Sequence, residues 1–143
     1  MSSIDNAIER LQDLALASTD LTIRAAPDYP VSDAGVLPIA IAHLTSGNGS
    51  PMEANTLLLF PTISVDFHFS RLSLKQAYTE IDACAAEFMR RLAGDPTLDE
   101  SVDTIVFPVT FTVQATQWDS IATQMLSFEV PVKTLENPIT TST

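Results

Sequence analysis

Asp66, His68 and His43 have the residue types and the spacing of a metal site. Asp66 and His68 are two residues apart in a predicted strand and therefore share a face, and His43 lies near the end of the preceding predicted strand. Two imidazoles and one carboxylate are ligands that zinc and related metals accept. Polar side chains are also expected on the solvent face of any strand, so the spacing alone does not indicate a ligand set. The sequence predicts no metal site.

Two further groups have the residue types of a hydrolytic site. Ser64, Asp66 and His68 are neighbours on one strand face. Same-face neighbours cannot place a nucleophile and an orienting group on opposite sides of the base, as a catalytic triad requires. Asp99 and Glu100 are adjacent carboxylates in a predicted loop, where nothing indicates the burial that acid–base catalysis needs. We therefore expect no catalytic residue.

The remaining candidates lack the rest of their motifs. Gly47 and Gly49 are followed by neither the lysine nor the helix of a phosphate-binding loop. Trp118 and Tyr29 are too isolated to form a base-stacking platform. Cys84 is the single cysteine and lies on the apolar side of a predicted helix, so we expect a buried thiol without a disulfide partner. The sequence predicts no cofactor site.

The charge of the chain is strongly negative. Its 143 residues include 18 acidic and 7 basic side chains, a formal net charge of −11, and the basic residues are scattered except for Arg90 and Arg91. Nucleic-acid affinity depends on clustered Lys and Arg, so this surface predicts repulsion of a polyanion. Such a balance suits either a soluble protein or a channel that DNA must pass without binding.

The first half of the chain indicates one helix and two strands. Apolar residues recur at helical spacing from Ile4 to Ala17. A strand is predicted from Leu37 to Leu44, then an exposed loop from Thr45 to Pro51. A second strand is predicted from Thr56 to Phe69, with a bulge or break at Pro61.

The second half indicates a long helix and a hairpin. Positions Leu74 to Leu92 carry one apolar stripe, with Ser73 as the N-cap and Gly94 as the stop. That stripe covers the apolar face of the strand before it, which the alternate residues Ile63 to Phe69 form, and Leu126 to Val132 show the same alternation. The predicted hairpin follows, with one arm from Ile105 to Val113, a turn around Trp118 and a second arm from Leu126 to Val132. The members of the helical stripe are Leu74, Ala77, Tyr78, Ile81, Cys84, Ala85, Phe88, Met89 and Leu92.

This element order predicts an α+β fold, in which an antiparallel β-sheet of four to five strands carries an N-terminal helix and a long central helix. We expect one domain over residues 1–136 and a flexible C-terminal tail over residues 137–143. The start of the chain has no signal-peptide pattern, and no apolar run is long enough to span a membrane, so neither is expected.

Several segments together resemble a known family. They are the opening helix from Ile4, Tyr29-Pro30, Leu37-Pro38, Val65-Asp-Phe-His-Phe-Ser-Arg71, Gly94-Asp-Pro-Thr-Leu98, and Gln117-Trp-Asp119 followed by Leu126-Ser-Phe-Glu-Val-Pro-Val-Lys133. In this order and spacing the chain resembles the tail terminator, or tail-completion, proteins of long-tailed bacteriophages. The resemblance covers Ile4 to Glu136.

The resemblance implies a virion structural protein without an active site. Such a subunit is made in the host cytoplasm and forms a homo-oligomeric ring, a hexamer, at the head-proximal end of the tail tube. The ring contacts the tail tube protein and the head–tail connector or neck protein, and DNA passes through it without specific binding. Apolar residues on second strand faces, such as Leu58, Phe60 and Val106, fit such an assembly. We expect contacts in the Thr45 to Asn55 loop and the Thr134 to Thr143 tail.

Two alternatives stay open on the sequence alone. One is a small-ligand or metal-dependent enzyme on a curved sheet, with Asp66 and His68 in its pocket. The other is a different head–tail joining protein of the neck, which would share the outline of the fold.

Overall fold

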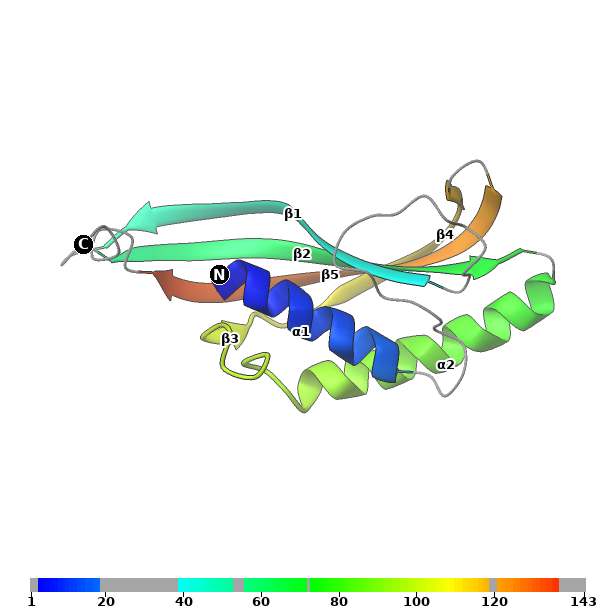
Figure 1. The fold of residues 1–143 in the computed structure, drawn as a ribbon, viewed down its shortest axis with the longest axis horizontal. Helices are drawn as coiled ribbons and strands as arrows, with labels where there is room; N and C mark the ends of the chain where they lie inside the picture. The colour runs from blue at the N-terminus through cyan, green and yellow to red at the C-terminus, as the bar shows by residue number, and fades with distance from the viewer. Residues whose placement is uncertain (1–2, 19–38, 53–55, 72, 119–120, 137–143) are drawn as a thin grey trace.

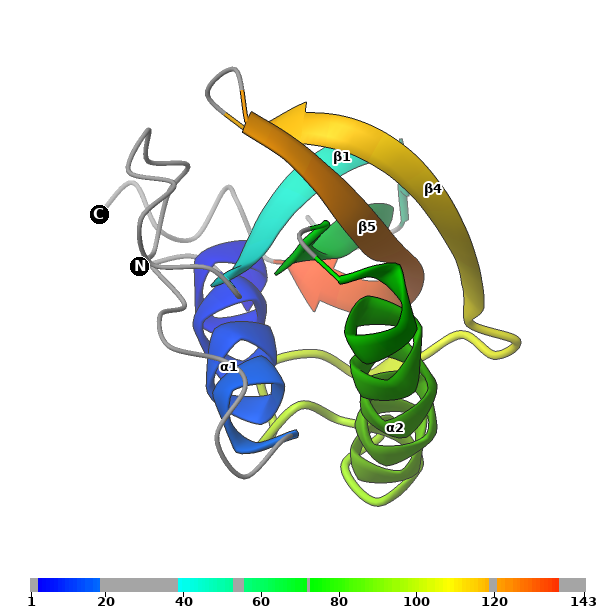
Figure 2. The same cartoon turned by 90° about the vertical axis from the view of Figure 1, so that its right-hand side faces the viewer.

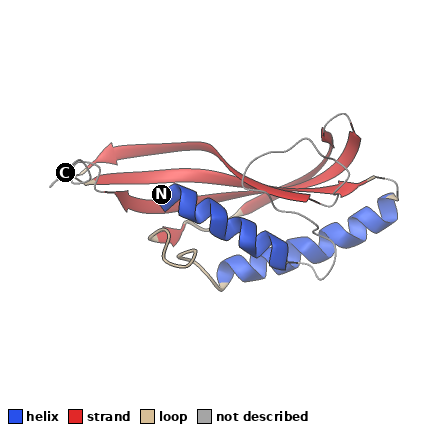
Figure 3. Ribbon diagram, in the orientation of Figure 1, coloured by secondary structure: helices blue, strands red, loops and turns tan. Residues whose placement is uncertain are grey.

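A long antiparallel sheet carries both helices on one of its faces (Figures 1 and 3). The computed structural model describes residues 3–18, 39–52, 56–71, 73–118 and 121–136. The strand order is β1-β2-β5-β3, with β4 also paired to β5, and all pairs are antiparallel. This is the predicted α+β fold. The elements are α1 (Ser3–Ala17), β1 (Ile39–Pro51), β2 (Leu57–Ser70), α2 (Leu74–Ala93), β3 (Thr104–Ile105), β4 (Thr110–Trp118) and β5 (Ile121–Glu136).

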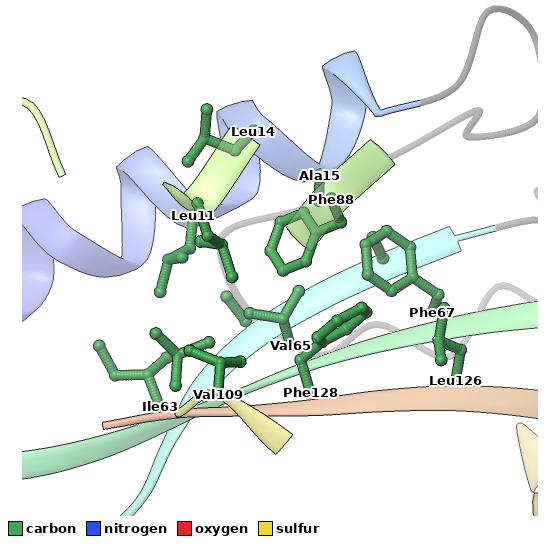
Figure 4. Close-up of a cluster of buried hydrophobic side chains, with 14 of the residues drawn as sticks. Leu11, Leu14, Ala15, Ile63, Val65, Phe67, Phe88, Val109, Leu126 and Phe128 are labelled. Carbon is green, nitrogen blue, oxygen red and sulfur yellow. The ribbon is translucent and has the colours of Figure 1, made fainter. Parts of the chain in front are cut away.

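The strand register gathers the largest apolar side chains under the helices. Val65 of β2 pairs with Phe128 of β5, and Phe67 pairs with Leu126, so all four point to the face that the helices cover, here called the helix face. Their side chains are fully buried together with Leu11 of α1 (Figure 4). The alternation predicted for both strands is confirmed.

Three phenylalanine rings join α2 to the middle of the sheet. The Phe88 ring centroid lies 5.3 Å from that of Phe67 and 4.7 Å from that of Phe128, both in edge-to-face geometry. Phe67 and Phe128 are themselves 5.9 Å apart. Edge-to-face pairs contribute about 0.5 to 1.5 kcal/mol each beyond the burial of their area.

The bounds predicted for the central helix are confirmed to within one residue. Ser73 is its N-cap, and its side chain accepts a hydrogen bond from the Gln76 N–H at 3.3 Å. Gly94 follows the last turn, and its N–H donates to the Arg90 carbonyl at 3.1 Å. The predicted apolar stripe extends too far toward the N-terminus, because Leu74 and Tyr78 are 44% and 47% exposed.

The first helix is linked to the sheet edge and to the turn after α2. The Gln12 side chain is buried, and its Oε1 accepts a hydrogen bond from the Ala42 N–H of edge strand β1. Arg10 donates through Nε to Asp95 Oδ2 at 2.7 Å. Negative charge on Asp95 raises the pKa of Arg10, chiefly through this hydrogen bond. These contacts orient α1 beside α2.

Strand β1 presents its small residues to the helices. Ala40 pairs with Phe67 and Ala42 pairs with Val65, so both alanines lie on the helix face and leave room for α1. Ile39 and Ile41 are buried on the opposite side of the sheet, here called the second face, because they pair with His68 and Asp66.

The prediction of a loop from Thr45 to Pro51 is wrong. These residues continue β1 and pair with β2 from Ser46 opposite Thr62 to Pro51 opposite Leu57. Glycine permits the close packing, since a Cβ at Gly49 would lie 2.5 Å from Leu59 Cδ2. The bulge falls at Thr45 in β1, and β2 runs through Pro61 without the predicted break.

The first arm of the predicted hairpin consists of two separate strands. Thr104 and Ile105 form β3, and β4 begins only at Thr110, with both strands paired to β5. Pro108 lies between them and has no N–H for a ladder. The sequence pattern also places Phe107 on one inward face with Ile105 and Val109, but Phe107 is 46% exposed. The second strand of the predicted hairpin is confirmed as β5. It is longer than predicted, since β5 reaches Glu136.

Several expectations fall on residues outside the described ranges. They concern Tyr29, Leu37 and Pro38, residues 53–55 of the expected contact loop, and the tail over residues 137–143. Within the described ranges, neither helix combines the length and apolar character needed to cross a bilayer.

Substitution of Leu92 by alanine is expected to lower the free energy of unfolding by about 2 to 5 kcal/mol, because Leu92 is fully buried. The matched control is Leu74→Ala at the exposed start of the same helix, with an expected loss below about 1 kcal/mol. Urea unfolding followed by circular dichroism measures both. Equal losses would contradict the assignment of the helix face.

Candidate functional site

Asp66 stands at the centre of a hydrogen-bonded cluster on the second face. Its Oδ2 lies 3.0 Å from His43 Nε2, and its Oδ1 accepts a hydrogen bond from Ser127 Oγ at 2.6 Å. His68, two residues further along β2, lies 3.0 Å from Thr123 Oγ1 through its Nδ1. Strand pairing explains the serine contact, since Ser127 is opposite Asp66 in β5.

The order of groups in this cluster does not match a nucleophilic triad. The serine hydroxyl and the imidazole of His43 contact different oxygens of the same carboxylate, so the base does not reach the hydroxyl. His68 is directed to Thr123. Among the described residues, no three His, Cys, Asp or Glu side chains lie close enough together to hold a metal ion. The cluster connects three strands of the sheet.

The environment of His68 favours its neutral form. Burial lowers its pKa below the usual 6.5, and the nearby negative charge of Asp66 offsets part of that effect. Its side chain is only 5% exposed. A protonated His68 therefore costs stability in the folded state.

Cys84 is buried in the core, as the sequence predicts. Burial raises the pKa of its thiol to about 12, and the negative charge of Glu80 adds to the shift. Reactive cysteines require the opposite, an accessible thiolate with a lowered pKa.

The adjacent carboxylates Asp99 and Glu100 lie in the turn after α2. Three consecutive residues, Leu98 to Glu100, have φ values of 50°, 56° and 64°, the left-handed region that side chains rarely occupy. The buried Leu98 side chain anchors the turn, and the Asp99 N–H donates to Asp95 Oδ1 at 2.9 Å. Both carboxylates are exposed, so Asp99 and Glu100 lack the burial that acid–base catalysis needs.

One end of the sheet extends past both helices (Figure 1). This end, here called the arm, consists of Ser46–Pro51 of β1, Leu57–Thr62 of β2 and Pro131–Glu136 of β5. Strands rise about 3.4 Å per residue and helices about 1.5 Å, so the 16 residues of β5 span roughly 50 Å but the 20 of α2 only roughly 30 Å. Helices of these lengths do not cover the whole arm. Its base is buried at Val132 and Thr134, and Ile4 of α1 lies beside Leu59, whereas Leu57 to Phe60 are partly exposed.

Apolar side chains lie on both faces of the arm. Leu57 and Leu59 point to the helix face, whereas Leu58 and Phe60 point to the second face, where Leu135 is directly opposite Leu58. The four β2 side chains are partly exposed and Leu135 is 48% exposed. The sequence prediction of apolar residues on the second face is confirmed for Leu58 and Phe60.

A second apolar surface lies between α2 and β4. Strand β4 curves away from α2 at this place (Figure 2) and leaves a groove of about 430 Å³. Phe111 and Val113 point to the helix face but remain 48% and 39% exposed. The groove is lined by Ile81, Asp82, Ala85, Ala86, Met89, Phe111 and Val113.

The sequence predicted only part of these features. It placed His43 near Asp66 correctly, but Ser127 is 61 residues away in the chain and its contact depends on the β2–β5 register. The arm was missed because its glycines and serines have the composition of a turn. A signal was present in the unbroken apolar run from Leu57 to Phe60, which is typical of strands covered on both faces.

No protein-family model matches this chain, and no curated protein matches it. The functional assignment therefore depends on the arm, the groove and the charge of the chain.

The unfolding free energy is expected to fall as the pH is lowered through about 6.5, because the unfolded chain then binds a proton that folded His68 binds only at lower pH. His68→Gln is expected to reduce this dependence between about pH 7.5 and pH 5.5. His43→Gln, which leaves His68 buried, serves as the control and should retain it. Urea titrations across the range measure the effect, and an unchanged His68→Gln profile would contradict it.

Cys84 is expected to resist a maleimide reagent at neutral pH in the folded protein and to react fully in concentrated urea, because its thiol is buried and un-ionised. Mass spectrometry of the labelled chain gives the fraction modified. Since the chain has one cysteine, fast labelling without urea would show directly that the thiol is accessible.

Proposed function

We propose that this protein is a virion structural subunit that forms a ring at the head-proximal end of a long-tailed phage tail. The ring ends growth of the tail tube and provides the surface that joins the tail to the head connector, and DNA passes through its centre. The subunit acts by binding other proteins and carries out no reaction.

The observation that carries the proposal is the exposed apolar surface of the arm. Side chains of Leu57 to Phe60 alternate between two faces, and all four are partly exposed. Adjacent apolar groups exposed on a monomer mark a protein interface. An arm that is apolar on both faces supports the proposal that neighbouring subunits cover it.

The charge of the chain supports the same proposal. A net charge of −11, from 18 acidic and 7 basic residues, favours repulsion of a polyanion. Repulsion between the ring and DNA suits a ring that DNA passes through, because DNA bound to the ring would not move.

The enzyme alternative gains no support from the cluster around Asp66. A hydroxyl and an imidazole on opposite oxygens of one carboxylate provide hydrogen bonds between strands and no activated nucleophile. The apolar surfaces at the arm and the groove favour assembly.

The purified chain is expected to form rings of roughly six times the 15.5 kDa chain mass, or to do so on tail tubes from the same virus. Light scattering measures the mass, and negative-stain microscopy shows a central opening in end-on views. A chain that stays monomeric at high concentration and does not bind the tubes would contradict the proposal. The tubes without this protein are the control.

The order of addition separates this function from that of another neck protein. A tail terminator binds completed tubes before the head joins them, whereas a head-bound joining protein binds filled heads first. Pull-down of the tagged chain with tubes alone and with heads alone distinguishes the two.

A further inference from the structure

We propose that the arm of one copy of this chain packs into the α2–β4 groove of the next copy. The contact is head to tail, since it joins two different surfaces of identical subunits. The inference rests on the proposed self-assembly and identifies the surfaces that mediate it.

The second face of the arm has the side chains for such a contact. Leu58 and Leu135 form a directly opposed pair in the β2–β5 ladder, and Phe60 follows Leu58 on the same face. These three side chains form one apolar ridge, and Lys133 lies on the same face two residues before Leu135.

The groove has the volume and the lining to receive that ridge. An apolar cavity of roughly 150 Å³ holds one benzene ring, so about 430 Å³ accommodates the Phe60 ring and leucine side chains. Phe111 and Val113 on one wall and Ala85 and Ala86 on the other leave the middle open.

Charge favours a second copy as the occupant of the groove. Two chains with a net charge of −11 repel each other over most of their surfaces. From Leu44 to Ile63 the sequence has one charged residue, Glu53, and Pro131–Glu136 adds Lys133 and Glu136. The low net charge of the arm therefore makes it the place where another copy can approach. Asp82 is the charged residue among those lining the groove, and Lys133 on the arm has the complementary sign.

The two surfaces lie on different parts of the fold. The arm is one end of the sheet (Figure 1), and the groove is lined by residues of α2 and β4. Contacts between unlike surfaces leave one arm and one groove free in every intermediate, so growth continues and ends in a ring where the rotation between neighbours closes it. Pairing of two arms would stop at a dimer and leave both grooves empty.

A mixing experiment tests the inference. The arm variant combines Leu58→Ser with Leu135→Ser, and the groove variant is Val113→Asp; all three positions are partly exposed, and circular dichroism checks folding. Each variant alone is expected to be monomeric. An equal mixture is expected to form dimers only, because one intact arm meets one intact groove. Tyr78→Ser, at an exposed site outside both surfaces, is the control and should assemble like the wild type.

A cross-link provides an independent measurement with cysteines at partly exposed positions. In a Cys84→Ala background, Phe60→Cys and Val113→Cys chains are mixed and oxidised with copper phenanthroline. The mixture is expected to give a 60–113 disulfide between chains well above the yield of 60–60 or 113–113 pairs, as mass spectrometry of peptides determines.

The outcomes separate this inference from the proposed function. If both variants assemble like the wild type, or if the mixture yields no dimer and no 60–113 cross-link, the arm–groove contact is wrong while the ring proposal stands. If the wild-type chain neither assembles nor binds tail tubes, both are wrong.

Discussion

The packing of Phe88 between Phe67 and Phe128 is the contact on which the rest of the structure depends. Helix α2 lies between β2 and the last three strands in sequence, but it must cover β2 and β5, which are neighbours in the sheet. Ring centroids 5.3 Å and 4.7 Å from Phe88 join all three elements at one point. With β5 held beside β2, its other edge is free to pair with β4 and β3.

A helix-covered sheet longer than its helices has uncovered ends. At about 1.5 Å per helical residue and about 3.4 Å per strand residue, a short insertion in a strand lengthens the sheet more than the same insertion lengthens a helix. The arm follows from this difference in rise. The groove has a related cause, since β4 curves away from α2 while still paired with β5. These two apolar surfaces therefore arise from geometry that one chain does not complete, and this is why we propose that they serve assembly.

The cluster around Asp66 shows how polar residues of a reactive type contribute to structure. His43, Asp66 and Ser127 come from three adjacent strands. The Asp66 carboxylate lies between the other two: it accepts a hydrogen bond from Ser127 and forms a second one with His43. The sequence could place His43 near Asp66 because their strands are consecutive. It could not identify Ser127 or Thr123, because their approach depends on a pairing of strands more than 50 residues apart in the chain.

The sequence by itself determined the periodic elements: the helix that ends at Ala17, the helix from Leu74 with its Ser73 cap, and the inward faces of β2 and β5. These elements follow from the spacing of apolar residues within one segment, which does not depend on contacts with the rest of the chain. Only the tertiary structure decided that Thr45–Pro51 is a strand, that Thr104 and Ile105 form their own strand, and that Ala40 rather than Ile39 faces the helices. The physical reason is that register, edge pairing and the room left by small residues are properties of two segments in contact, which one segment's composition does not contain.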